Sequence, residues 1–165
     1  MQLFPGRYTA QTSEPFVVFL IGMRVNKLFQ LGQWLPVAKA MPPMIEELKR
    51  QPDLGLLHVE FAIYWRGIMT IQYWRSFDHL HAYAHARNAA HLPAWAEFNR
   101  RTGNNGSVGI WHETYAVEPG SYEAIHVNMP RFGLGRAFDH VPVKGRLDNA
   151  RGRMNQSEAE STRSA

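Results

Sequence analysis

The sequence contains no cysteine among its 165 residues. This absence excludes disulfide bonds, thiolate-bound metals, iron–sulfur clusters and a cysteine nucleophile. Any metal would therefore need histidine, aspartate or glutamate ligands, and the chain has eight histidines. A long apolar run is also missing, because the longest one, Phe16 to Met23, falls far short of the about 20 residues that cross a bilayer.

Acidic residues are in mild deficit, and targeting signals are missing. The chain has 18 Lys and Arg against 14 Asp and Glu, which gives a net charge of +4. This excess fits an anionic ligand but falls short of the basic surface of a nucleic-acid-binding protein. The N-terminus has no basic segment followed by an apolar stretch and a small-residue cleavage site. We therefore predict a cytoplasmic protein with no nucleic-acid partner and no membrane partner.

Hydrophobic residues make up 45% of the chain, which is enough for a folded core, and the length fits one domain. Their patterns alternate between runs typical of strands and spacings typical of helices. Strands are predicted at 15–25, 56–65, 68–74, 108–117 and 122–127, and helices at 31–50, 76–87 and from 93 onward. Ser76 suits an N-cap, and the prolines at 36, 42 and 43 predict a break or kink in the first helix.

The resulting order β-α-β-β-α-β, with one extra strand, predicts an α+β protein with the ferredoxin-like split βαβ fold. We assign residues 1–144 to this domain and expect residues 145–165 to form a disordered tail, because they contain few apolar residues. Helices in this fold cover one face of the sheet only. Alternate residues from Leu57 to Trp65 are all apolar, so we expect a second copy to bury the other face in a homodimer.

Four histidine positions differ in their surroundings. His81 and His85 share a helix face at a metal-binding spacing, but the polar sequence around them favours a solvated face. His58 and Glu60 share a strand face, either as an acid–base pair or as a hydrogen bond at the dimer interface. His112 shares its strand parity with apolar residues, which favours a structural role and leaves a ligand or catalytic role open.

His91 is the most suggestive histidine. It lies between two predicted helical segments, beside alanines that leave room for a flat ligand, and Trp95 follows four residues later. One interpretation is an imidazole that binds iron or orients a substrate, and the other is a helix-capping side chain bonded to backbone.

Four sequence strings carry a resemblance to a known family. They are Tyr73-Trp-Arg-Ser-Phe77, His91-Leu-Pro-Ala-Trp-Ala-Glu-Phe-Asn-Arg100, Ile110-Trp-His-Glu-Thr-Tyr115 and Asn128-Met-Pro-Arg-Phe-Gly-Leu-Gly135. With the element order, they make residues 5–136 resemble the antibiotic-biosynthesis monooxygenases, a superfamily of dimeric α/β barrels, and within it the DUF4188 group, named for a monooxygenase of fumagillin biosynthesis. The resemblance implies a small oxidoreductase with a small hydrophobic or aromatic substrate, held in a cavity between sheet and helices.

One branch of this superfamily binds haem, and the resemblance then makes His91 the axial iron ligand. Trp95 would lie beside it, Arg75 would pair with a propionate, and Trp74 and Tyr83 would form walls of the haem site. The same resemblance leaves two alternatives open. One is a haem lyase of the aldoxime-dehydratase type, and the other is a non-catalytic module that binds haem or a small hydrophobic molecule.

The other branch oxidises electron-rich aromatic substrates with O₂ and needs no cofactor. For this branch the resemblance implies that His91 or His112 acts as a base toward a phenolic substrate. Asn26 and Arg24 would then orient that substrate beside O₂. In the haem branch, by contrast, His112 would donate a proton on the distal side of the haem, or it would hydrogen-bond to a residue that binds the iron. The two branches therefore share a set of site residues but assign them different roles.

Overall fold

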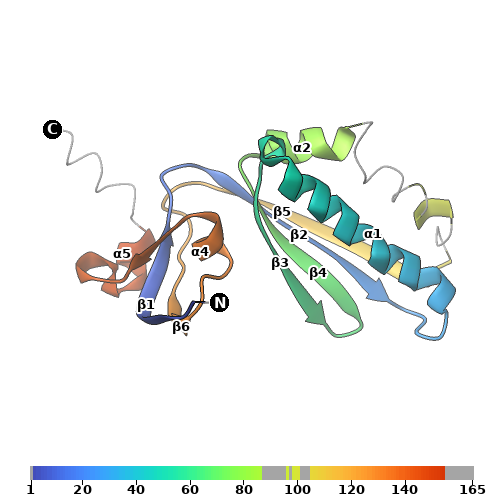
Figure 1. Cartoon of the computed structure of the whole chain (residues 1–165), viewed down its shortest axis with the longest axis horizontal. Coiled ribbons are helices and arrows are strands. Elements are labelled where there is room, and N and C mark those ends of the chain that lie inside the picture. The colour runs from blue at the N-terminus through green and yellow to red at the C-terminus, as the bar shows by residue number, and fades with distance from the viewer. Residues whose placement is uncertain (1, 87–95, 97, 101–104, 155–165) are drawn as a thin grey trace.

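A computed structural model describes residues 2–86, 96, 98–100 and 105–154 of the chain. Its strands form two antiparallel sheets (Figure 1). The larger sheet contains β2 (Phe16–Val25), β3 (Leu56–Tyr64), β4 (Gly67–Trp74) and β5 (Val108–Val117), and the smaller contains β1 (Phe4–Gln11), β6 (His126–Met129) and β7 (Asp139–Pro142). The helices are α1 (Leu31–Arg50), α2 (Phe77–His85), α4 (Leu134–Ala137) and α5 (Ala150–Met154), with 3₁₀ turns at Pro52–Leu54 and Gly145–Asp148.

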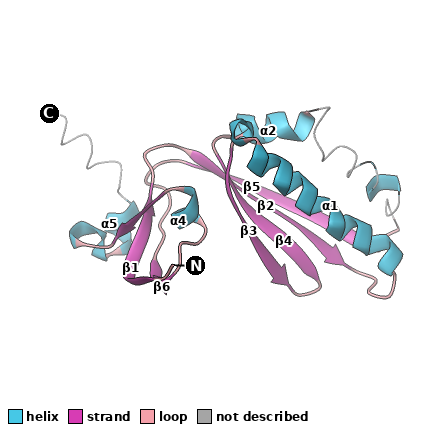
Figure 2. Ribbon diagram, in the orientation of Figure 1, coloured by secondary structure: helices cyan, strands magenta, loops and turns pink. Residues whose placement is uncertain are grey.

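The larger sheet has the strand order β3-β4-β2-β5. α1 connects β2 to β3, and α2 follows β4 on the way to β5, so the chain order within this unit is β-α-β-β-α-β. This is the split βαβ topology, and the predicted ferredoxin-like α+β fold is confirmed. Figure 2 shows the two helices as one layer beside this sheet. No helix in the described part of the chain is long and apolar enough to cross a membrane.

The core of this unit lies between the sheet and the helices. Side chains from alternate positions of the strands meet apolar side chains of α1 and α2 there, because successive strand residues point to opposite faces. The buried members are Val17, Val59, Trp74, Ile45, Leu48, Leu80 and Tyr83. Ser76 accepts a hydrogen bond from the backbone N–H of His79, which confirms it as the N-cap of α2.

The prolines do not break α1. The helix runs unbroken over 20 residues with Pro36, Pro42 and Pro43 inside it. Each proline removes one backbone donor from the helix, which normally costs stability. Burial of Ile45 and Leu48 against the sheet opposes that cost. The predicted break is therefore wrong.

The apolar residues at alternate positions of β3 lie on the face of the sheet that points to the helices. We had expected a second copy of the chain to cover that face. Val59 belongs to the helix-facing core, whereas Phe61 and Ile63 of the same parity are 54% and 89% exposed. An irregularity in the β3–β4 register lies between Leu56 and His58. Because side chains alternate with a period of two, strand parity says which residues share a face but not which face is buried.

The smaller sheet was not predicted as a unit. Its order is β6-β1-β7, with β1 paired antiparallel to both neighbours. The sequence indicated an extra strand at 122–127, but the structure places β6 at His126–Met129. The pattern of β1 is hidden because Pro5 and Gly6 interrupt it and most of its first half is exposed.

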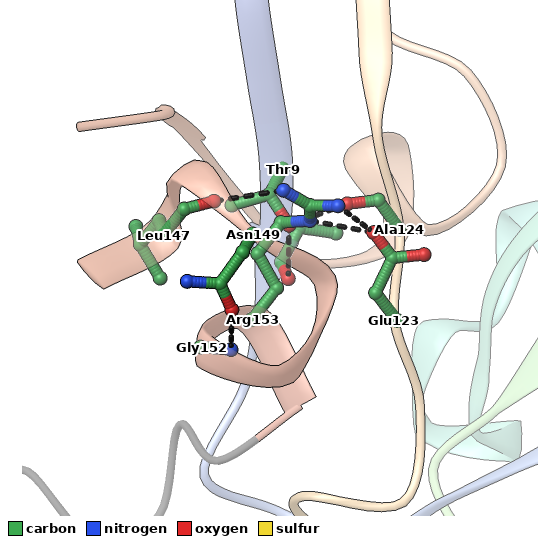
Figure 3. Close-up of polar contacts among 8 residues, drawn as sticks. Thr9, Glu123, Ala124, Leu147, Asn149, Gly152 and Arg153 are labelled. Carbon is green, nitrogen blue, oxygen red and sulfur yellow. Dashed lines mark hydrogen bonds and ion pairs between the residues drawn. The ribbon is translucent and has the colours of Figure 1, made fainter. Parts of the chain in front are cut away.

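The segment after residue 144 is folded as far as residue 154. Arg153 of α5 is 7% exposed, and its guanidinium donates to Glu123 Oε1 at 2.5 Å and to the Leu147 carbonyl at 2.8 Å (Figure 3). Asn149 Oδ1 accepts from the Gly152 N–H at 2.8 Å and closes the first turn of α5. The predicted disordered tail is therefore wrong for residues 145–154, and residues 155–165 lie outside the described part.

Candidate active site

Polar side chains form a hydrogen-bonded row on the helix-facing side of β4. Trp74 Nε1–H donates to Gln72 Oε1 at 2.9 Å, and Gln72 Nε2–H donates to Thr70 Oγ1 at 3.0 Å. All three side chains are almost fully buried. They point the same way because they occupy every second position of one strand. The row is directional: each group donates to the next, and the Thr70 hydroxyl stands at its end with its own proton to donate.

The sheet register places Thr70 and a histidine on the same face and at the same level of the sheet, two strands apart. Phe61 pairs with Thr70, Thr70 pairs with Ile21, and Ile21 pairs with His112, so one level of the sheet reads Phe61, Thr70, Ile21, His112. Two strand spacings separate Thr70 from His112, which is about 10 Å. A small ring that lies over Ile21 spans this distance. Phe19, one level further along β2, contacts the His112 ring at 5.6 Å between centroids.

Trp74 and Tyr83 are in contact in the core. Their ring centroids are 5.9 Å apart, and they are 1% and 8% exposed. Tyr83 of α2 donates its hydroxyl hydrogen to Glu47 Oε2 of α1 at 2.8 Å. Burial and this hydrogen bond to a carboxylate raise the pKa of Tyr83 well above 10. Tyr83 therefore stays protonated and joins the two helices above the sheet.

Three other expected site residues lie elsewhere. Arg24 and Asn26 are at the opposite end of β2 from Val17, which pairs with Trp74. Seven residues of strand separate Arg24 from Val17, a distance of about 23 Å. Arg24 points away from the helices and covers the Trp65 ring at 5.0 Å, and Asn26 Nδ2 donates to the Gly106 carbonyl at 3.2 Å. Arg75 is exposed after β4, and its backbone N–H donates to the Gly55 carbonyl. The structure therefore does not bring Arg24 and Asn26 to Trp74, and Arg75, although next to Trp74 in the chain, lies at the surface.

The haem expectation depends on residues outside the described part. His91 and Trp95 lie within residues 87–95, whose structure is not described. The other expected walls, Trp74 and Tyr83, are packed against Val17, Leu48 and Leu80 rather than facing an open surface. A haem at that position would have to displace the core. The described residues therefore do not fit a haem beside Trp74.

His58 and Glu60 form a second polar group, on the face of the sheet that points away from α1 and α2. His58 Nε2 and Glu60 Oε1 are 2.9 Å apart, with side chains 16% and 14% exposed. The Gly133 backbone N–H, just before α4, donates to the same Glu60 oxygen at 3.1 Å. Burial and the charge of Glu60 raise the pKa of nearby Tyr73. This group therefore connects α4 to β3 within one chain.

The sequence interpretation missed Thr70, Gln72 and Glu47. For the first two a signal was present, because Thr and Gln at every second position of an otherwise apolar strand mark one face as polar. No comparable signal exists for Glu47. It is one of two adjacent glutamates on α1, and only the packing of α2 shows that it meets Tyr83.

Comparison with known proteins places this chain in a family. Residues 16–134 match the family model described as monooxygenase af470-like. Monooxygenase af470 of Aspergillus fumigatus is 30% identical over 161 residues, covering 87% of this chain and 54% of that protein. The chain thus spans about half the length of this curated relative.

Two solved structures are similar at low identity. SnoaB, a cofactor-independent oxygenase from Streptomyces nogalater, is 12% identical with a TM-score of 0.44, covering 62% of this chain and 93% of that one. A dimeric protein of unknown function with a ferredoxin-like fold from Bacteroides fragilis is 14% identical with a TM-score of 0.45, covering 62% and 96%. The family model, by contrast, matches well over half of the chain, and the chain therefore belongs to the monooxygenase af470-like family.

Proposed function

We propose that the chain is an oxygenase that oxidises a small aromatic substrate on the helix-facing side of the larger sheet. Membership of a monooxygenase family supports the reaction class. The observation that carries the proposal is the directional hydrogen-bonded row from Trp74 through Gln72 to Thr70. Buried polar groups cost stability relative to apolar ones, so a row of three in a core layer suits a site that must orient a polar group.

The ends of one sheet level supply complementary chemistry. The Thr70 hydroxyl accepts from Gln72 and is thereby oriented to donate its own proton to an oxygen of the substrate. His112, on the same level, offers an imidazole nitrogen as the base that accepts a phenolic proton. Phe19 and Phe61 are the aromatic neighbours of these two positions. A phenol held between Thr70 and His112 is activated because deprotonation makes its ring electron-rich.

The reaction balances without an added reductant. A phenol that takes one oxygen atom from O₂ on its ring and gives up two hydrogens becomes a quinone, while the second oxygen atom leaves as water. In this scheme His112 takes the phenolic proton first, and Thr70 hydrogen-bonds to the oxygen that becomes a carbonyl. Both roles require only proton movement and orientation by the protein.

The haem-dependent version remains a separate prediction that depends on His91. A haem would supply oxygen activation at its iron, and His91 is the residue that we expect to hold it. Purified protein reconstituted with haemin tests this prediction through its absorption spectrum. A Soret shift that disappears in His91→Ala supports it, and a shift that survives this substitution contradicts it.

O₂ consumption tests the proposed function directly. Wild-type protein incubated with monocyclic and bicyclic phenols and hydroquinones should consume O₂, with quinone and water as products. Thr70→Val and His112→Phe should each lower kcat/KM about 100-fold, because each removes one hydrogen-bonding or proton-transferring group. Thr12→Val and His85→Phe make the same chemical changes far from the site and should leave kcat/KM unchanged.

Two results would contradict the proposal. One is binding of these phenols without any O₂ consumption, which would instead support a non-catalytic binding module. The other is an equal loss of activity in the site variants and the distant controls. Thermal unfolding of every variant, measured alongside, separates a lost reaction from a lost fold.

A further inference from the structure

Large apolar side chains project into solvent at one end of the larger sheet. Phe29 is fully exposed, and Ile63 and Trp65 are 89% and 74% exposed. These residues come from the end of β3 and the β3–β4 turn, and from the β2–α1 loop with the first turns of α1. We call them the hairpin-end patch: Leu28, Phe29, Leu31, Leu35, Ile63 and Trp65.

Hydrogen bonds join the two segments of the hairpin-end patch, the β3–β4 turn and the end of β2. The Val25 N–H donates to the Arg66 carbonyl at 2.7 Å. The Arg66 side chain donates back to the Val25 carbonyl at 3.0 Å and to the Asn26 carbonyl at 2.6 Å. Trp65 therefore lies next to the start of the loop that presents Phe29. Figure 1 shows the β3–β4 turn and the β2–α1 loop at the same end of the sheet.

Basic side chains surround this apolar end, and acidic ones are missing from the segments that build it. Arg24 and Arg66 lie over the Trp65 ring at 5.0 and 5.7 Å, and Lys27 is exposed. The sequence has no Asp or Glu from residue 15 to 45 and none from 61 to 77. The modest net charge of the whole chain therefore hides a local excess of positive charge.

We infer that the hairpin-end patch binds the surface of an anionic lipid membrane. Aromatic and aliphatic side chains that enter the headgroup region, with Lys and Arg beside them, are the composition of peripheral membrane sites. A fluid bilayer accepts side chains that protrude separately, as those of Phe29, Ile63 and Trp65 do. The expectation of no membrane partner considered spanning segments only, so this inference revises it for peripheral binding.

The charges argue against a second copy of the chain as the occupant. A twofold contact places the same patch on both partners. The positive charges of Arg24, Lys27 and Arg66 would then meet a partner surface with the same three charges, and like charges in contact oppose association. A negatively charged lipid surface instead pairs with all three. It also lets their long aliphatic stems lie against the apolar region.

Co-sedimentation of the full chain with vesicles tests this inference. Wild-type protein should bind vesicles made of equal parts phosphatidylcholine and phosphatidylserine. It should bind much more weakly to vesicles of phosphatidylcholine alone. Phe29→Ser should lower the partition coefficient about tenfold, because it removes the most exposed ring. Lys27→Glu should lower it on anionic vesicles only, and raised salt should weaken wild-type binding.

Matched variants on the smaller sheet side provide the controls. Leu3→Ser removes another exposed apolar side chain, and Lys144→Glu reverses another exposed charge. Both should bind vesicles like the wild type. The inference is overturned if wild-type protein binds neither vesicle, or if Phe29→Ser binds like Leu3→Ser. It is also overturned if light scattering shows that Phe29→Ser changes the oligomeric state, because a second copy would then cover the patch.

Discussion

At the scale of single residues, Gln72 in the middle of the buried row determines whether Trp74 and Thr70 have hydrogen-bond partners. Gln72 is the only partner that the described residues give to the Trp74 indole N–H, and it also donates to Thr70. We expect Gln72→Leu to lower the free energy of unfolding by about 1–3 kcal/mol, because the buried indole N–H loses its acceptor. Urea unfolding measures this change.

A surface glutamine provides the comparison for Gln72. Gln51, at the end of α1, is exposed, and Gln51→Leu should change the free energy of unfolding by no more than about 0.5 kcal/mol. Equal effects of the two substitutions would show that the row on β4 contributes nothing as a hydrogen-bonded unit. The Thr70 hydroxyl would then have no defined direction, and the proposed role of Thr70 would lose its support.

Two histidines in the smaller sheet predict a loss of stability in acid. His126 and His140 have ring centroids 5.3 Å apart, and Arg131 lies close enough to act on His140. Burial lowers the pKa of both imidazoles below the ordinary value of 6.5. The unfolded chain therefore binds more protons than the folded one as the pH falls below 6.5. Their contribution to stability is complete above that pH and declines below it.

The histidine prediction is checked with unfolding midpoints between about pH 5 and pH 8. His140→Gln should flatten part of the acid decline, because glutamine does not titrate in this range. His85→Gln changes an exposed histidine of α2 and should leave the profile as in the wild type. An unchanged decline in His140→Gln would show that other groups cause it.

At the scale of elements, the sequence predicted the larger sheet well because its strands are strongly apolar. β2 and β5 match the predicted strands within one residue. The smaller sheet escaped prediction because its strands are short and its contacts join residues more than 100 positions apart, such as Tyr8 and His126. The alternation of side chains along β5 predicted that His112 and Ile110 share a face. Only the register between strands shows that Thr70 of β4 lies at the same level of the sheet as His112.

The polar anchor of α5 explains why composition misled the prediction of a tail. Polar composition usually indicates disorder, but here the buried Arg153 guanidinium binds Glu123 and the Leu147 carbonyl. We expect Arg153→Leu to lower the free energy of unfolding by about 1–3 kcal/mol, since it leaves Glu123 without its charged partner. It should also speed proteolysis within residues 145–154.

Arg151 is the matched control for Arg153. It lies two residues earlier in α5 and is exposed, so Arg151→Leu should leave stability and proteolysis unchanged. Hydrogen exchange of the amides in α5 provides a second measurement. If exchange is the same in Arg153→Leu and the wild type, the ion pair does not hold this segment.

At the scale of the whole molecule, the face of the larger sheet opposite α1 and α2 has an apolar centre. Leu20 pairs with Ile71 there, next to Val18 and Met69, and these side chains are only partly buried within one chain. Apolar sheet faces of this kind are normally covered. α4 reaches the β3 edge of this face through Gly133 and Glu60, the residue that pairs with Ile71, and Leu20 and Ile71 beside it stay partly exposed. We therefore still predict a homodimer that packs through this face.

The centre of the face is where a charge would be most costly to a dimer. Leu20→Arg would place two long charged side chains in the twofold contact and out of water, which is costly even beside Glu113, the β5 residue that pairs with Leu20. We expect wild-type protein to be dimeric by light scattering at micromolar concentration, and Leu20→Arg to be monomeric with the fold retained by circular dichroism. Phe77→Arg adds the same charge at an exposed position of α2 and should remain dimeric. A monomeric wild type, or a Leu20→Arg variant that stays dimeric, would show that this face is not the contact. Leu20 lies on the other face of the sheet from the proposed site and outside the hairpin-end patch. The effect of Leu20→Arg on assembly can therefore be measured independently of oxidation and of membrane binding.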